Sequence, residues 1–374
     1  WVGVGSADEP ENISGISHFL EHMILKARPG EARGPLARTV QDAGGYLNAR
    51  TGSDHTAFYQ VVPSLQWEAV LGAQSKVLSS PHFEEESVDA ERSVIIEEAR
   101  MSELNPSAFS WKRMMEGALA GSGYGRRITG SEESLDRIDG RALSEHFGRW
   151  YVPGNMVQVV VGDVDADRVI HRARELLDRI GSSGGEARSG GTGGPSSGPP
   201  PVSSGPVGED RMPEWTPGCV LAEGNVRQPY LVAGFRAPPV RHPDIPVLDV
   251  LCGLLGLGRS SRLRKSLQTD SGLVSDVGAT VVAHRDVSVV ALSAVGTLGT
   301  SPASIVEGLL REVELLRRAP ADGNEMLKSI RRLEAGYLLE HETVESIAMS
   351  LGFFQTMGDH SYAEEFIDRL AAVT

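Results

Sequence analysis

His18-Phe19-Leu20-Glu21-His22 is the most informative part of this sequence, because it predicts both a structural element and a chemistry. At helical spacing, positions i, i+3 and i+4 share one face, so the two imidazoles and the Glu21 carboxylate project together. Both imidazoles can then bind one metal ion, whereas Glu21 lies beside them and is poorly placed to be a third ligand. A carboxylate there is suited to accept a proton from a metal-bound water. The stretch predicts a zinc-binding helix with its own base, with a solvated amphipathic helix as the alternative.

A second predicted helix supplies the third ligand that a catalytic zinc site needs. Such sites have three protein ligands and one open position. In the helix expected over 91–101, Glu91 and Glu98 are seven residues apart and lie nearly on one stripe, whereas Glu97 is turned by about 100° from Glu98. We therefore assign Glu98 as the third ligand and Glu91 to the layer behind it, where it orients a ligand or tunes the site. A charged, solvated helix face is the alternative for both residues.

Length and composition indicate a large globular protein and exclude several classes. At 374 residues the chain exceeds the size at which one core is usual, so two domains are expected. The net charge of −14 argues against nucleic acid and anionic membranes as partners. Two cysteines, Cys219 and Cys252, provide no disulfide framework, and no apolar run is long enough to span a bilayer. We expect a cytoplasmic protein, although the chain opens at Trp1 inside a predicted strand, which leaves a removed targeting segment open.

A linker divides the sequence into two similar halves. Twenty of the 26 residues over 183–208 are Gly, Ser or Pro, too polar and irregular to pack. We predict domains at 1–182 and 219–374, joined by a linker over 183–218. The first half is expected to form a strand (1–6), helices (16–26, 35–43), strands (around Asn48 and 57–62) and helices (66–79, 91–101). The second is expected to repeat this order with a strand (230–235), helices (247–257, 261–268), strands (278–283, 287–295) and helices (302–318, 325–341). This is a divergent repeat of α+β units, and only the first carries His-x-x-Glu-His, so one zinc ion is expected.

Further motifs lie on either side of the zinc motif. They are Gly5-Ser6-x-Asp8-Glu9-Pro10, the stretches 44–51 and 54–59, Glu91-Arg92-x-Val94-x-x-x-Glu98, and Tyr151-x-Pro153-x-Asn155-Met156 followed by 157–162. With these motifs the chain resembles the M16 zinc peptidases, the family of pitrilysin, insulin-degrading enzyme and the mitochondrial processing peptidase, and its zinc motif has the inverzincin order. The resemblance is to the M16B type. It implies an α+β fold of two homologous domains, each a mostly antiparallel β-sheet flanked by helices.

The resemblance also implies an activity and a set of site residues. It implies a zinc-dependent endopeptidase that cleaves extended or unfolded peptides, with Zn²⁺ held by His18, His22 and Glu98, and with Glu21 and Glu91 in the catalytic machinery. Residues 44–49 are expected to form an exposed strand that pairs with a peptide backbone. Phe19, Asn48 and Ala49 are the expected substrate contacts, with a plain turn residue as the alternative for Asn48. His55 either braces the site or is structural.

One departure from the family concerns the second domain. Self-sufficient M16 proteins carry there an Arg and a Tyr, in Leu-Arg-x-x-x-Gly-Leu-x-Tyr, that contact the substrate. This chain keeps Gly272 and Leu273, but Gln268 replaces the Arg and Ser275 the Tyr. Gln carries no fixed charge, and Ser is too short to reach where a phenol would. We therefore predict the zinc-bearing subunit of a heterodimer whose homologous partner supplies Arg and Tyr; an active homodimer is the alternative.

The sequence leaves other hypotheses about the function open. The chain could be a non-catalytic M16 scaffold, although such subunits usually lose zinc ligands, or a peptide-binding subunit with slow turnover. Removal of leader segments from precursor peptides and degradation of short unfolded peptides both fit as tasks. The repeat predicts a further helix and strand after Thr374, so we expect the second domain to be trimmed at its end.

Overall fold

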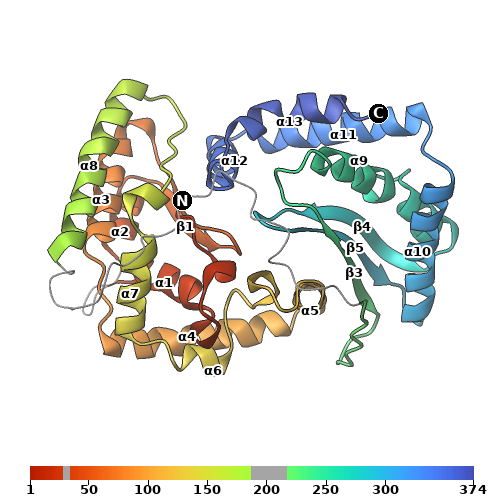
Figure 1. Cartoon of the computed structure of the whole chain (residues 1–374), viewed down its shortest axis with the longest axis horizontal. Helices are drawn as coiled ribbons and strands as arrows, with labels where there is room; N and C mark the ends of the chain where they lie inside the picture. Colours follow the sequence, from red (N-terminus) through yellow and green to blue (C-terminus); the bar gives the residue numbers. More distant parts are fainter. Residues whose placement is uncertain (28–33, 187–216) are drawn as a thin grey trace. The chain divides into compact units, whose positions relative to one another are not determined.

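The computed structural model describes residues 1–27, 34–186 and 217–374, and Figure 1 shows its helices and strands. Most of the predicted linker, 187–216, lies outside the described residues, and helix α8 (Ala166–Glu186) ends just before it. Contacts divide the described chain into two compact units, the first within 1–99, 126–205 and 343–360, the second within 100–125, 206–342 and 361–374. Each unit has a hydrophobic core of its own.

The helix that carries the zinc motif, α1 (Ile16–Leu25), lies in the core of the first unit. It starts after Gly15, whose φ of 95° is in the left-handed region that favours glycine. The apolar face of α1, including Ile16 and Phe19, packs in one cluster with side chains of α4 (Glu85–Glu103) and α7 (Gly140–Trp150). This packing anchors α1 and leaves Glu21 and His22 half-buried at its polar side.

The sheet of the first unit is smaller than the sequence predicts. Strands β1 (Tyr46–Thr51) and β2 (Thr56–Val61) pair in antiparallel fashion, and no described strand pairs with the other side of β1. The strand predicted at 1–6 is reduced to isolated bridges, in which Val2 pairs with Thr56 and with Met156, and residues 157–162, which follow the Tyr151 motif, form no strand. Glycines at positions 3 and 5 weaken a strand here, and the chain forms a short helical turn (Ser6–Asp8) directly after them.

The remaining helices of the first unit surround this sheet and α1. They are α2 (Pro35–Asp42), α3 (Trp67–Ser79), α6 (Glu132–Leu135), α8 and, from the C-terminal part of the chain, α12 (Val344–Thr356), which contacts β2. The expected helices at 16–26, 35–43, 66–79 and 91–101 are thus confirmed, with shifts at their ends that are largest for α4, which begins six residues before the expected start.

The second unit holds an antiparallel sheet with the order β3-β5-β4. Its strands are β3 (Tyr230–Ala237), β4 (Val274–Val282) and β5 (Ser288–Gly296), and its helices are α5 (Pro106–Ala118), α9 (Ile245–Gly256), α10 (Pro302–Arg318), α11 (Gly323–Glu340) and α13 (Ser361–Ala371). From α9 to α11 the order helix, helix, two strands, two helices repeats that from α1 to α4. The second helix of this repeat is a π-helix (Arg264–Asp270) instead of the α-helix expected over 261–268. The two small antiparallel sheets flanked by helices confirm the predicted α+β fold.

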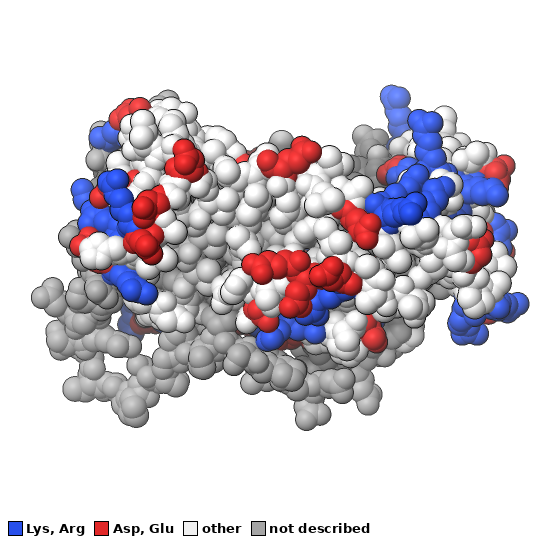
Figure 2. All heavy atoms as spheres, turned by 90° about the horizontal axis from the view of Figure 1, so that it is seen from above, with Lys and Arg blue, Asp and Glu red and all other residues white. Residues whose placement is uncertain are grey.

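Charge is unevenly spread on the surface. On the face shown in Figure 2, Lys and Arg side chains gather most densely toward the right-hand end of the view, and smaller groups of them lie beside Asp and Glu side chains at the left-hand end and below the centre. None of the helices in the described ranges is long and apolar enough to cross a membrane.

Candidate metal centre

Three potential ligand atoms converge between α1 and α4. Nε2 of His18 lies 3.8 Å from Oε1 of Glu98, and Nε2 of His22 lies 3.4 Å from Oε2 of the same carboxylate. The ligand atoms of the three residues all lie within 4.8 Å of one another. Two imidazoles and one carboxylate form a donor set typical of catalytic zinc sites. The three residues therefore fit a zinc ion, and the Glu98 side chain, 50% exposed, keeps the cluster accessible to water.

His22 is oriented by Glu91, which lies behind it. Nδ1 of His22 and Oε1 of Glu91 are 2.8 Å apart. Hydrogen bonds from His22 and Lys26 lower the pKa of Glu91 to about 2, so the carboxylate is ionised and can only accept. In the neutral imidazole, Nδ1 of His22 must then donate, which leaves a lone pair on Nε2, the atom nearest Glu98. Glu91 thus selects the tautomer of His22 that can bind a metal.

His18 is buried, with only 8% of its surface exposed. Burial, reinforced by the neighbouring His22, lowers the pKa of His18 to about 4. The imidazole is therefore neutral near pH 7, as a metal ligand must be. Its buried Nδ1 has no hydrogen-bond partner among the described residues, so the ring is held by packing.

Glu21 lies beside the three converging residues and is bound by the edge strand. The hydroxyl and the backbone N–H of Thr51 both donate hydrogen bonds to its carboxylate. Burial raises the pKa of Glu21, and the hydrogen bonds from Thr51 offset only part of that effect. A carboxylate whose pKa is raised toward neutrality is a more effective general base, because it binds the transferred proton more tightly.

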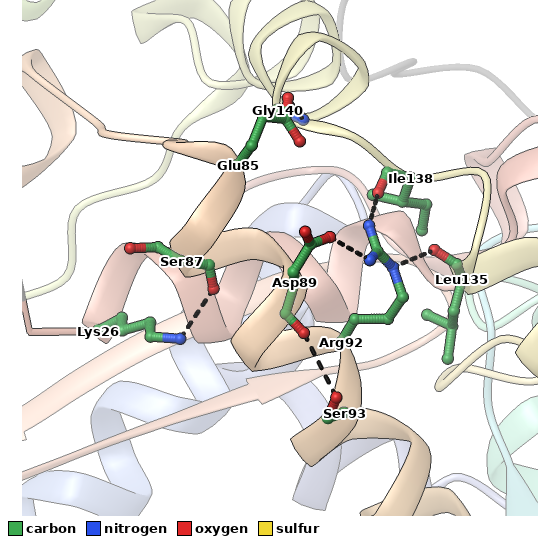
Figure 3. A network of polar contacts seen from close by, with 9 residues as sticks. All are labelled: Lys26, Glu85, Ser87, Asp89, Arg92, Ser93, Leu135, Ile138 and Gly140. Carbon is green, nitrogen blue, oxygen red and sulfur yellow. Dashed lines mark hydrogen bonds and ion pairs between the residues drawn. The ribbon is translucent and has the colours of Figure 1, made fainter.

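Helix α4 is held in place by Arg92, as Figure 3 shows. Nε of Arg92 donates to the carbonyl of Leu135 over 3.1 Å, and Nη2 donates to that of Ile138 over 2.7 Å. These bonds tie α4 to the end of α6 and to the segment that joins α6 and α7. They fix the helix that carries Glu98 without touching any of the converging side chains.

The substrate-binding residues expected from the sequence lie in different surroundings. Asn48 is exposed on β1, and its side-chain oxygen accepts a 2.9 Å hydrogen bond from the N–H of Ala49, which is itself half-buried. The prediction that Phe19 contacts the substrate is wrong, because Phe19 is 0% exposed and belongs to the core cluster. Its position, one residue after His18, turns its side chain onto the apolar face of α1, where no substrate can reach it.

His55 is part of an aromatic cluster. Its ring centroid lies 4.8 Å from that of Trp1 and 5.6 Å from that of Phe353 in α12, and the side chain is buried. This packing favours a structural role for His55 over a role in the metal site.

Gln268 and Ser275, the two departures from the family pattern, are neighbours in the second unit. Nε2 of Gln268 donates to the carbonyl of Ser275 over 2.6 Å, and Oγ of Ser275 donates to the carbonyl of Val295 over 3.2 Å. Both side chains thus bond to the local backbone. Gln268 lies in the π-helix, a conformation that often occurs at functional sites.

Three residues that support the site were not predicted from the sequence. Thr51 binds Glu21, Lys26 binds Glu91, and the buried Glu9 accepts hydrogen bonds from the N–H groups of Gly15 and Ser17 at the start of α1. Spacing offered a signal for two of them. Thr51 is two residues after Ala49 on the same strand face, and Lys26 directly follows the last residue of α1, four residues after His22.

Comparison with known proteins finds relatives that span most or all of the chain. An uncharacterized zinc protease of Bacillus subtilis is 26% identical over 374 residues, covering 100% of this chain and 86% of the relative. An uncharacterized zinc protease of Mycobacterium leprae is 29% identical, covering 74% of this chain and 59% of the relative. Among solved structures, a protease from Helicobacter pylori matches with a TM-score of 0.84 at 21% identity, covering 100% of this chain and 87% of that one.

Family models describe both halves. The model of the insulinase family, peptidase family M16, matches residues 1–132, and that of the peptidase M16 inactive domain matches residues 137–333. The first contains the three converging residues and Glu21, and the second contains no copy of the zinc motif. Sequence motifs, fold and family models agree, and the chain belongs to the M16 peptidase family.

Proposed function

We propose that this protein is a zinc-dependent endopeptidase that cleaves extended or unfolded peptides. The observation that carries the proposal is the convergence of His18, His22 and Glu98 within 4.8 Å, with the Glu21 carboxylate fixed beside them. Relatives named zinc proteases support the choice of metal. When bound, zinc would polarise the attacking water and the scissile carbonyl.

The remaining steps belong to the residues of the chain. Glu21 accepts a proton from the attacking water and passes it to the leaving amine, so one carboxylate serves as base and then as acid. Thr51 holds that carboxylate in place through both of its hydrogen bonds. Glu91 keeps His22 in the tautomer whose Nε2 lone pair is free.

Substrate binding is assigned to strand β1. The side of β1 that no described strand occupies can pair with an extended peptide through backbone hydrogen bonds. Asn48 is exposed on this strand, so its amide can bond the backbone of the added peptide. Thr51, at the end of the same strand, contacts Glu21, which would bring the bound peptide close to the base.

The proposal includes a homologous partner subunit. Gln268 and Ser275 stand where self-sufficient relatives have Arg and Tyr, and neither can supply a charge or a phenol. An M16 partner that carries this Arg and Tyr would complete the machinery. Activity of the chain alone equal to that of its mixture with such a partner would contradict this part. Leader segments of precursor peptides are the substrates we would test first.

Replacing the base tests the activity itself. Purified protein should contain about one zinc per chain and cleave an unstructured peptide, with the partner present. Glu21→Gln should keep the zinc and lose about 10²- to 10⁴-fold in kcat, the usual contribution of a general base. A peptide-binding subunit or scaffold would show no change in its behaviour on this substitution. Full cleavage by Glu21→Gln would therefore overturn the proposal.

A further inference from the structure

A lysine completes the support behind the candidate metal ligands. Lys26 follows the last residue of α1, four residues after His22. Its Nζ lies 2.7 Å from Oε2 of Glu91, and the opposite oxygen of that carboxylate, Oε1, lies 2.8 Å from Nδ1 of His22. The ammonium and the imidazole thus bind the two oxygens of one carboxylate from either end.

The lysine also bonds the helix that carries Glu91. Its Nζ donates to the carbonyl of Ser87 over 2.9 Å, one turn before Glu91 on α4, as Figure 3 shows. Two of the three donors of the ammonium are therefore used on α4. The side chains of Lys26 and Glu91 are 25% and 13% exposed, so their contact is sheltered from solvent. Sheltered, charge-assisted hydrogen bonds are stronger than exposed ion pairs.

We propose that Lys26 is a positioning residue for the zinc site, holding Glu91 so that His22 presents its Nε2 to the metal. The inference rests on the proposed function, because it assumes that His18, His22 and Glu98 bind the ion. Glu91 can orient His22 only while its carboxylate keeps one rotamer. Without Lys26, the partly buried carboxylate would keep only His22 as a partner among the described residues and would be free to turn.

The competing explanation is that Lys26 merely ties the end of α1 to α4. Arg92 offers a matched control, because it also anchors α4 through backbone carbonyls, yet contacts neither Glu91 nor His22. Loss of an anchor lowers the free energy of unfolding in both variants. Only the Lys26 variant should change how the metal is held.

The test compares Lys26→Met, Lys26→Arg and Arg92→Met in the full-length protein. Zinc release to a chelator and the visible spectrum of the cobalt-substituted protein report the metal site directly, and thermal unfolding reports stability. Lys26→Met should weaken zinc binding by about 10- to 100-fold, the usual cost of losing an outer partner of a metal ligand, and should alter the cobalt spectrum. Lys26→Arg should restore most of the affinity, and Arg92→Met should unfold at lower temperature with an unchanged spectrum.

Different results would show that the role of Lys26 is wrong or that the proposed function is wrong. If Lys26→Met released zinc at the rate of the unchanged protein, with the same cobalt spectrum, Lys26 would be an anchor only and the inference would be wrong. If the unchanged protein bound neither zinc nor cobalt, the proposed function itself would fail, whatever Lys26 does. Equal loss of metal from Lys26→Met and Arg92→Met would also contradict the inference, because general loosening of α4 would then explain it.

Discussion

The hydroxyl of Thr51 donates a hydrogen bond to the carboxylate of Glu21, and so joins the edge strand to the helix of the zinc motif. The backbone N–H of Thr51 bonds the same carboxylate, and the side chain is only 8% exposed. Because β1 is also the strand proposed to bind peptides, one residue links the base to the substrate. Any shift of β1 would therefore move the base relative to the attacking water.

Loss of the Thr51 hydroxyl should slow the reaction without removing the metal. In Thr51→Val the carboxylate keeps only the backbone donor. A hydrogen bond to a charged group contributes about 1.5–3 kcal/mol, so we expect kcat to fall by about 10- to 100-fold. Zinc content should be unchanged. Steady-state kinetics and metal analysis check both statements, with Thr51→Ser as the control that keeps a hydroxyl. A Val variant with unchanged kcat would show that the backbone bond is sufficient.

Glu98 and Glu97 provide a matched pair for the third ligand. Glu98→Gln replaces a carboxylate in the converging group by a neutral amide, whereas Glu97 is not part of that group. Loss of a direct ligand should cost more than the roughly 10- to 100-fold cost of losing an outer partner, so Glu98→Gln should lose zinc on dialysis. Glu97→Gln should retain it. Retention of zinc by both variants, measured by metal analysis, would refute the assignment of Glu98.

His146 should make the fold sensitive to acid. It is 6% exposed, its Nε2 lies 3.2 Å from Oγ of Ser17, and burial lowers its pKa from 6.5 to about 4. On acidification the unfolded chain takes up a proton at His146 before the folded chain does. The contribution of the neutral, buried imidazole to the free energy of unfolding is therefore complete above pH 6.5 and is lost as the pH falls toward 4. The largest loss of unfolding free energy from this one group is about 3 kcal/mol, which follows from the size of the pKa shift.

The measurement for His146 is the free energy of unfolding between pH 4 and 7 in the metal-free protein. His146→Gln removes the titrating group, so its stability should fall less steeply with acidification than that of the unchanged protein. His171→Gln is the control, because the His171 side chain is 80% exposed. Identical pH dependence of the His146→Gln variant and the unchanged protein would contradict the prediction.

Restoring the family residues tests the need for a partner. Gln268→Arg with Ser275→Tyr reinstates the charge and the phenol that the chain lacks. A donor that stabilises developing negative charge contributes about 10²- to 10³-fold to kcat, so we expect the doubly substituted chain to cleave peptides at least about tenfold faster alone. Gln268→Met with Ser275→Phe supplies similar bulk without charge or hydroxyl and should show no gain. An equal gain in both variants would point to packing instead of chemistry.

Local residue patterns were sufficient for much of the fold and for the group of candidate ligands. The spacing of His18, Glu21 and His22 places them on one helix face whatever surrounds the helix, because 3.6 residues complete one turn. The seven-residue spacing of Glu91 and Glu98 works in the same way. Short-range patterns therefore predicted α1, α4 and most other helices, together with the α+β class.

The contacts between those elements depended on tertiary structure. No spacing rule brings Thr51 to Glu21, because they are 30 residues apart, or Lys26 to Glu91 and Ser87 on another helix. Phe19 was misassigned for the same reason: the family resemblance implied a substrate contact, whereas packing places the side chain in the core. The sequence alone determined which side chains share a face of a helix or strand, since that follows from backbone geometry. Only the packing of α1, α4 and β1 against one another decided which of those faces meet, because that depends on side chains far apart along the chain.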